Sequence, residues 1–393
     1  MTVYPKPRIP LRPALSVQSF FSARGRRVAN ILDVKNQRVV TSGRVAFALA
    51  LSELSVQAGD EVLVPAFHCT SMIEPVTWLK AQPVFYRIAR DTSVDFEDLE
   101  RRVTSATRAL LVTHYFGFLQ DITKLRALCD ARGLALIEDC AHCLFGEIAG
   151  QPVGALSDYA IISLTKFFPT YDGGCLVSSR NTLDRVSLRS AGLAFDAKAA
   201  ANALEYALEH GRLKWLSPIV ALPLKVKDRL WHSVKGDAPI GPDSSDGGYG
   251  FDSAWVNKRA SLAARIITAT ASLPRIYDLR RAHYLRLHEA LRNLSGAEPL
   301  FHDLPEGIAP YVYPLKVAEP DRVFPALKHL GVPILRFGEY LTPEMPPETC
   351  PQTAEFSRKL LQFPCHQELT EDELDWMIDC IVRTFREEAR KTA

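Results

Sequence analysis

From about residue 40 to residue 180, short apolar runs rich in β-branched residues alternate with stretches of helical periodicity. Gly, Pro or Asp bounds each run, a pattern typical of βαβ units. We predict helices over Ser42–Leu54 and Lys124–Arg132. The predicted strands are Glu61–Val64, Ala109–Thr113, Leu134–Ile137, Tyr159–Ser163 and Cys175–Ser178. Strands joined by crossover helices indicate an α/β fold with a mostly parallel central sheet flanked by helices, which binds ligands at the carboxyl ends of its strands.

After about residue 181 the pattern changes to long helical segments, with a Gly/Ser/Asp-rich break at Gly236–Gly250. A helix is predicted from about Lys258 to Asn293, then a strand over Tyr311–Val317. The final helix, about Glu371–Lys391, begins with acidic residues, which favour a helix N-terminus. The predicted organisation is therefore an N-terminal arm, a large domain with a helical insertion, and a long connecting helix with a smaller α+β C-terminal domain. The corresponding ranges are 1–40 for the arm, 41–255 for the large domain, about 181–250 for the insertion, and 256–393 for the remainder.

Composition narrows the function classes. The chain has 393 residues, 47% of them hydrophobic and 23% charged, which is typical of a globular protein. A formal net charge of +2 is too small to favour binding to a nucleic acid. No run approaches the roughly 20 apolar residues that cross a bilayer, so no integral membrane segment is expected. Eight scattered cysteines without a framework spacing predict reduced thiols in a cytoplasmic protein.

Lys166 follows an apolar strand and precedes Phe167. Desolvation depresses the pKa of a lysine, and a neutral amine can attack a carbonyl to form a Schiff base. The alternative is a structural lysine whose stem is covered and whose ammonium reaches water. Ser163, which could bind a phosphate, and the Gly173–Gly174 pair, which lets the backbone approach a flat ligand, favour the catalytic interpretation.

Two other clusters lie at predicted strand ends or helix starts. Asp139 ends a buried strand and needs a cationic partner or donors; a protonated pyridine nitrogen is one such partner, and a helix N-cap is the alternative role. Ser42, Gly43 and Arg44 open a helix, whose free N–H groups and positive dipole end attract anions. A plain helix start would explain the same residues.

A metal site is disfavoured. Cys140, His142 and Cys143 form one cramped cluster, and His68 with Cys69 does not supply the matching second pair that structural zinc sites use. We therefore expect no metal.

Together these segments resemble the DegT family of fold-type I pyridoxal-phosphate enzymes, mostly sugar aminotransferases. The resemblance rests on the order of seven segments: TSGRVAFALAL, GDEVLVPAFHCTS, THYFGFLQDI, LIEDCAHCLFG, SLTKFFPTYDGGCLV, WVNKRASLAARI and SRKLLQFPCHQELTEDELDWM. It implies that pyridoxal 5'-phosphate is the cofactor, that Lys166 is the Schiff-base lysine, that Asp139 pairs with the pyridinium nitrogen and that His142 neighbours the ring hydroxyl.

The resemblance also implies the remaining contacts. Backbone amides of Gly43 and Arg44 would hold the phosphate, with Ser163 near it, although the family's phosphate serine commonly lies where Ile161 stands here. Cys69 replaces an aromatic residue that stacks on the ring in many relatives. Stacking would then be weaker or supplied by another residue such as Phe67 or His114. Asn257 matches an asparagine that reaches the phosphate across a subunit interface, which implies a homodimer with shared active sites.

The implied activity is transfer of an amino group from an amino donor, with glutamate expected, to a keto sugar, nucleotide-linked or a related biosynthetic acceptor. The retained lysine favours this reaction over dehydration. A non-catalytic sensor on the same fold, or a pyridoxal-phosphate enzyme for a non-sugar substrate, stays open. The long insertion is either a surface elaboration or a cover for the active-site mouth, and the second case would suit an acceptor other than an ordinary soluble nucleotide hexose.

Overall fold

The computed structural model describes residues 4–20, 27–216 and 250–392. Its largest unit is a seven-stranded sheet with the order β1-β9-β8-β5-β4-β2-β3, in which β9 alone runs against its neighbours. The strands are β1 (Asn36–Val40), β2 (Glu61–Pro65), β3 (Gln82–Tyr86), β4 (Thr107–Thr113), β5 (Ala135–Asp139), β8 (Tyr159–Ser163) and β9 (Gly174–Ser178). A two-stranded hairpin, β6 (Glu147–Ile148) and β7 (Gln151–Pro152), lies beyond β5.

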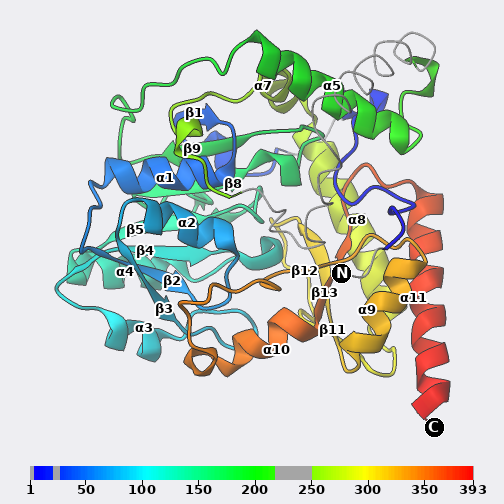
Figure 1. Ribbon diagram of the computed structural model, residues 1–393. Coiled ribbons are helices and arrows are strands. Elements are labelled where there is room, and N and C mark those ends of the chain that lie inside the picture. Colours follow the sequence, from blue (N-terminus) through cyan, green and yellow to red (C-terminus); the bar gives the residue numbers. More distant parts are fainter. Residues whose placement is uncertain (1–3, 21–26, 217–249, 393) are drawn as a thin grey trace.

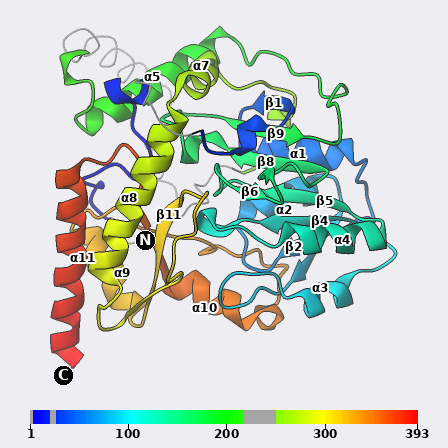
Figure 2. The same ribbon diagram turned by 180° about the vertical axis from the view of Figure 1, so that it is seen from behind.

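Helices cover both faces of this sheet. α1 (Gly43–Glu53) and α2 (Thr70–Trp78) lie on the face toward the viewer in Figure 1, and α3 (Phe96–Arg102) and α4 (Ile122–Arg132) lie on the other face, toward the viewer in Figure 2. Right-handed crossovers between parallel strands produce this arrangement. The strand interiors are apolar and fully buried, as at Leu63, Leu110 and Leu136, because both faces are covered.

The second unit is a four-stranded antiparallel sheet of order β10-β11-β13-β12 with helices packed beside it. Its strands are β10 (Ala297–Pro299), β11 (Val312–Val317), β12 (Leu335–Arg336) and β13 (Leu360–Pro364). The helices are α8 (Leu273–Leu291), α9 (Pro320–His329), α10 (Pro351–Lys359) and α11 (Glu371–Thr392). The predicted α/β fold with a smaller α+β unit is confirmed.

The predicted single helix from 258 to 293 is wrong. Residues before Leu262 are extended, and Arg259 bridges Val40 at the edge of the large sheet. The helical part is split into α7 (Leu262–Thr270) and α8 by an extended Ala271. Ser272 caps α8 and Pro274 lies in its first turn, where the missing N–H breaks no helical bond. The apolar periodicity continued across this break and concealed it.

The domain boundaries stay a prediction, and two features bear on them. β1, within the segment expected to form the arm, is an edge strand of the large sheet, paired with β9. The expected insertion contains α5 (Leu193–Glu209), which packs on α7, and the short 3₁₀ helix Lys214–Leu216. Residues 217–249 of the insertion lie outside the described residues. In the described ranges no helix is both long and apolar enough to cross a bilayer.

Candidate active site

A cavity of about 860 Å³ opens where the carboxyl ends of β4, β5 and β8 meet the start of α1. The structure brings seven of the eight predicted site residues together around it, and Asn257 does not line it. The seven are Gly43, Arg44, Cys69, Asp139, His142, Ser163 and Lys166. Residues from four separate sequence motifs therefore face one space, as expected at the strand ends of a parallel sheet.

Asp139, the last residue of β5, places a buried carboxylate at this cavity. Its Oδ1 accepts a hydrogen bond from the Ala141 N–H at 2.8 Å, which forms a local turn, and no helix follows. The N-cap alternative for Asp139 is therefore wrong. Its Oδ2 has only a long contact of 3.5 Å with the Thr113 hydroxyl. Burial raises the pKa of Asp139, and the Ala141 N–H and the Lys166 ammonium oppose this rise.

His142 lies between two parallel aromatic rings, with ring centroids 4.7 Å from Tyr311 and 5.7 Å from Phe116. Its Nδ1 accepts a hydrogen bond from the Phe116 N–H at 3.4 Å. Its buried Nε2 has no hydrogen-bond partner among the described residues. Burial, and then the positive charge of Lys166, hold the pKa of His142 well below its usual value. The cavity thus contains a neutral imidazole with one unused nitrogen.

Lys166 ends the short 3₁₀ helix η4 (Leu164–Lys166) that follows β8, and its Nζ lies 5.3 Å from the centre of the Tyr311 ring. Its backbone carbonyl accepts a hydrogen bond from the fully buried Arg280 of α8 at 2.7 Å. The Arg280 guanidinium also donates to the Tyr311 carbonyl at 3.0 Å and to Gln367 Oε1 at 3.0 Å. Burial lowers the pKa of Arg280 to about 10. The smaller unit of the fold therefore fixes the backbone that carries Lys166.

Ser42 is the N-cap of α1, and its Oγ accepts a hydrogen bond from the Val45 N–H at 3.2 Å. The plain helix start and the anion-binding interpretation are thus compatible, because capping by Ser42 engages only one of the first N–H groups of α1. The Arg44 guanidinium pairs with Glu74 at 3.1 Å. The Ser163 side chain lies directly beside Gly43: a Cβ built on Gly43 would be 3.4 Å from Ser163 Cβ.

The Gly173–Gly174 pair was expected to let the backbone approach a flat ligand, and only Gly173 lies at the cavity. A Cβ on Gly174 would lie 2.2 Å from the backbone carbon of Ser42, so this glycine allows β9 to approach the start of α1 rather than a flat ligand. Gly173 lines the cavity with φ +132°, a conformation that L side chains rarely adopt.

Two aromatic side chains proposed to stack on a ligand do not line the cavity. Phe67 is fully buried among Tyr115, Phe337 and Phe356. The imidazole of His114 bonds to Glu138 Oε2 at 2.9 Å. Cys69 does line the cavity, and its Sγ contacts the Ser71 hydroxyl at 2.8 Å. Aromatic rings at the cavity come instead from Phe47, Tyr171, Phe251, Trp255 and Phe337.

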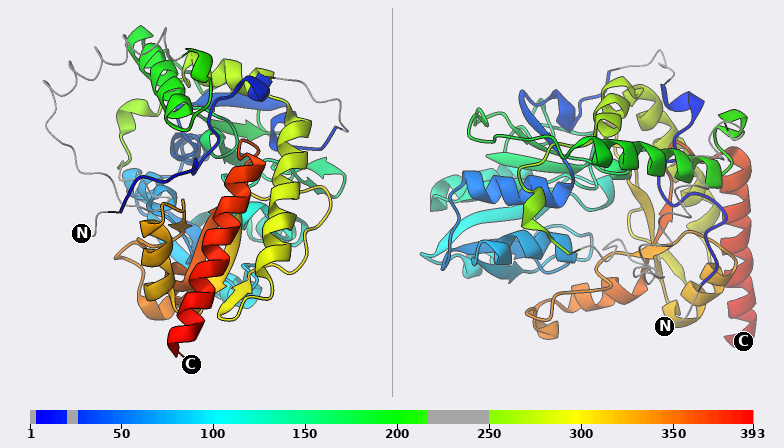
Figure 3. Two further views of the ribbon diagram at one scale, coloured as in Figure 1. Left: turned by 90° about the vertical axis from the view of Figure 1, so that its right-hand side faces the viewer. Right: turned by 45° about the horizontal axis from the view of Figure 1, so that its top comes forward.

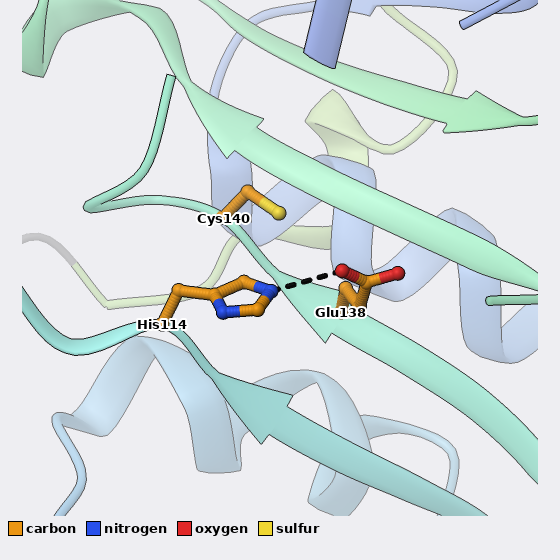
Figure 4. Close-up of side chains that lie close together, drawn as sticks. All are labelled: His114, Glu138 and Cys140. Carbon is orange, nitrogen blue, oxygen red and sulfur yellow. Dashed lines mark hydrogen bonds and ion pairs between the residues drawn. The ribbon is translucent and has the colours of Figure 1, made fainter. Parts of the chain in front are cut away.

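The neighbours of Asp139 in the chain, Glu138 and Cys140, form a buried cluster with His114 (Figure 4). The possible ligand atoms of the three side chains lie within 4.8 Å of one another. His114 Nδ1 accepts a hydrogen bond from the Gln120 N–H at 3.0 Å, so the ring proton belongs on Nε2, which donates it to Glu138. Both ring nitrogens are then engaged, and neither offers a lone pair to a metal. The geometry favours a hydrogen-bonded network, not a metal centre.

Asn257 is exposed, and its backbone carbonyl accepts a hydrogen bond from the Arg189 N–H at 2.8 Å.

Several residues that line the cavity could not be predicted from the sequence, because they come from distant segments. Arg12 comes from the N-terminal region, and Phe251 and Asp252 follow the insertion. Asp172 accepts hydrogen bonds from both the hydroxyl and the N–H of Ser261, at 2.6 and 2.8 Å. The only feature of the sequence that could have indicated the Asp172–Ser261 contact is that both residues lie near predicted strand ends or helix starts.

The sequence of residues 21–205 matches the profile of the DegT/DnrJ/EryC1/StrS aminotransferase family. This part of the chain, just under half of it, is therefore similar to that family. The matched region contains every predicted site residue except Asn257.

Two curated relatives and one solved structure extend the comparison. The chain is 36% identical over 164 residues to GDP-perosamine synthase of Vibrio cholerae, and 34% identical over 165 residues to a UDP-N-acetyl-3-dehydro-α-D-glucosamine 3-aminotransferase of Acidithiobacillus ferrooxidans. These matches span 41% and 40% of this chain and only 45% and 44% of the relatives. The aminotransferase TlmJ of Streptoalloteichus hindustanus shares the fold with a TM-score of 0.64 at 19% identity, over 90% of this chain and 87% of that one. The similarity to the DegT family is thus limited to about half of the chain, whereas the likeness to TlmJ in fold extends over 90% of it.

Proposed function

We propose that this chain is a pyridoxal-phosphate-dependent aminotransferase that moves an amino group from an amino donor, glutamate, to a keto sugar. The observation that carries the proposal is a buried carboxylate, Asp139, facing the same cavity as Lys166 at the ends of two strands of a DegT-family region. A carboxylate that burial disfavours and that few donors reach is suited to a protonated ring nitrogen.

The residues present fit this cofactor. Asp139 Oδ2 would accept a hydrogen bond from the protonated ring nitrogen of the cofactor, and His142 Nε2 would bond to the ring hydroxyl. The start of α1 with Ser163 would hold the phosphate. Lys166 would bind it covalently through Nζ. When bound, the cofactor supplies an electron sink for the carbon that carries the amino group.

The chain's own residues have separate tasks in this reaction. Asp139 keeps the ring nitrogen protonated, because an ionised carboxylate in a buried site favours a bound proton on its partner. Lys166 Nζ, once free, would be the base that accepts the proton of the donor's α-carbon and later gives it back. Arg280 fixes the backbone of Lys166, and the rings of Tyr311 and Phe116 hold His142 in place.

The acceptor class is supported by the names of the relatives, one a synthase of a GDP-linked amino sugar and one an aminotransferase for a UDP-linked keto sugar. We propose a nucleotide-linked keto sugar or a related biosynthetic acceptor for this chain. The functional unit would be a homodimer in which Asn257 reaches the partner's site. All eight cysteines are free and buried, which supports a cytoplasmic location.

The test is chemical. Reduction of the purified protein with borohydride, followed by peptide mapping, should place a pyridoxyl group on Lys166, and Lys166→Ala should abolish turnover while the cofactor still binds noncovalently. A label on another lysine would refute the assignment. A sensor of the same fold would bind cofactor and yet leave it unchanged when glutamate is added, whereas the aminotransferase converts it to the pyridoxamine form.

A further inference from the structure

The cavity contains a third positive charge that the proposed cofactor does not use. The guanidinium groups of Arg12 and Arg44 and the ammonium of Lys166 line it. Arg44 is paired with Glu74, and Lys166 interacts with Asp139. No ion pair joins Arg12 to a carboxylate anywhere in residues 4–20, 27–216 and 250–392. Arg12 therefore brings a half-buried, uncompensated cation to the site.

Arg12 is held in this position by α5, the described helix of the insertion. The Tyr206 hydroxyl accepts hydrogen bonds from the Leu11 N–H at 3.1 Å and the Arg12 N–H at 3.3 Å. The Arg12 guanidinium carbon lies 4.8 Å from the centre of the Tyr206 ring, which is a cation–π contact. The N-terminal segment, dark blue in Figure 3, runs beside α5 and α11. A fixed guanidinium binds an anion with less loss of side-chain entropy than a free one.

Tyr311 is a common neighbour of Arg12 and Lys166. The charge of Arg12 acts on the Tyr311 hydroxyl and opposes the rise in its pKa, and the ring of the same tyrosine lies 5.3 Å from Lys166 Nζ. Arg12 and Lys166 thus line the same cavity and both act on Tyr311. An amino acid whose nitrogen reaches Lys166 carries a carboxylate two bonds from that nitrogen, and a planar guanidinium matches a carboxylate bidentately.

We infer that Arg12 binds a carboxylate of the amino donor and that Tyr206 is the positioning residue for it. This inference rests on the proposed function and adds a role for the insertion: its helix α5 completes the donor site by holding the N-terminal segment. A neutral keto sugar has no group of this kind, so Arg12 distinguishes the donor from the sugar ring of the acceptor.

The first experiment follows the visible absorption of the bound cofactor in single turnovers against glutamate concentration. Arg12→Gln should raise the apparent Kd for glutamate roughly ten- to a hundredfold, with a smaller change in the limiting rate, because a charge-assisted hydrogen bond is lost. Tyr206→Phe should give a smaller rise in the same direction. The matched control is Lys6→Gln, which removes an equal charge from the same segment, where Lys6 is exposed and pairs with Glu209 at 3.5 Å; its Kd should stay unchanged.

The second experiment needs neither turnover nor a variant. Phenylglyoxal labelling of Arg12 in the cofactor-loaded protein, mapped by mass spectrometry, should slow severalfold when glutarate is present. UDP should not protect Arg12; protection by UDP without protection by glutarate would overturn the inference and assign Arg12 to a phosphate of the acceptor. Unchanged glutamate dependence in Arg12→Gln with no protection by glutarate would overturn it too, and would leave the proposed function intact. If glutamate does not alter the cofactor of the wild-type protein while glutarate protects Arg12, the proposed donor reaction fails and the carboxylate site stands.

Discussion

Asp139 is buried in the folded chain, and burial disfavours its ionised form. The proposed reaction, however, requires that form. Burial raises the pKa of its carboxyl group, so the folded chain binds this proton more tightly than the unfolded chain does. The ionised form therefore destabilises the cofactor-free fold, and this cost appears as the pH rises from the unfolded pKa, about 3.9, through the raised folded value. Such a conflict between stability and local charge is typical of a functional residue.

Asp139→Asn should separate these two effects. The cofactor-free variant should be more stable than the wild type by about 1–3 kcal/mol at pH 8, because the amide carries no buried charge. The gain should shrink toward pH 4, where both states of the wild-type Asp139 become protonated. Urea unfolding at both pH values measures this, and the loaded variant should lose several orders of magnitude in rate because an amide does not keep the ring nitrogen protonated. Near-normal rates would reduce Asp139 to a structural acid.

Residues within one short motif could be predicted from sequence, and contacts between distant segments could not. Asp139 and Lys166 were found because each follows an apolar strand, so their side chains must emerge at one edge of the sheet. Arg280, which bonds to the carbonyl of a residue 114 positions away, and Tyr206, which bonds to Leu11 from 195 positions away, carry no local signal. Only the tertiary packing of the folded chain brings these pairs together.

At the scale of elements, the junction between β9 and α1 determines where the first turn of α1 points. Gly174 pairs with Val40 and lies against the backbone of Ser42 and Gly43, so the strand and the helix start are closer than any side chain would allow. The apolar pattern predicted both β9 and α1, but the role predicted for Gly174, a close approach to a ligand, was wrong. A close approach between two backbones and a close approach to a ligand have the same signature in a sequence.

Gly174→Ala should therefore be severely destabilising, by about 3 kcal/mol or more, because its Cβ would lie 2.2 Å from a backbone atom that cannot move without displacing α1. Gly43→Ala is the matched control, since its Cβ would make an ordinary contact of 3.4 Å with Ser163 and alanine favours a helix. Thermal unfolding of the cofactor-free variants compares them. Equal stability of the two would show that β9 and α1 can separate without cost.

At the scale of the whole molecule, the contact between the two units of the fold depends on the protonation state of a buried histidine. His68, in the loop after β2, donates from Nδ1 to the Ala66 carbonyl at 2.7 Å and accepts at Nε2 from the Thr342 N–H at 3.0 Å. Burial lowers the pKa of His68 to about 4. A second proton would face the Thr342 N–H and break the link between β2 and the C-terminal part of the chain.

The expected consequence is acid sensitivity. Because the folded pKa of His68 is lowered, its contribution to stability is complete above the unfolded value, about 6.5, and is lost as the pH falls toward 4. The free energy of unfolding should fall by roughly 3 kcal/mol over this window from His68 alone. In His68→Gln that part of the slope should disappear, as measured by urea unfolding at half-unit steps of pH. An unchanged slope would assign the acid sensitivity to His142 and His366, whose pKa values burial also lowers.

The proposed homodimer is tested by Asn257, which is exposed and does not line its own cavity. If it completes the partner's site, Lys166→Ala and Asn257→Ala subunits are each inactive alone for different reasons. In a mixed dimer one site lacks both residues and the other retains both. When the two variants are mixed in equal amounts, about half of the dimers are mixed, and each of these has one intact site out of two. About one quarter of the wild-type activity should therefore return. Activity assays after subunit exchange, verified by native mass spectrometry, measure this recovery. Exchange without recovered activity would place Asn257 outside the partner's site and leave each subunit with a site of its own.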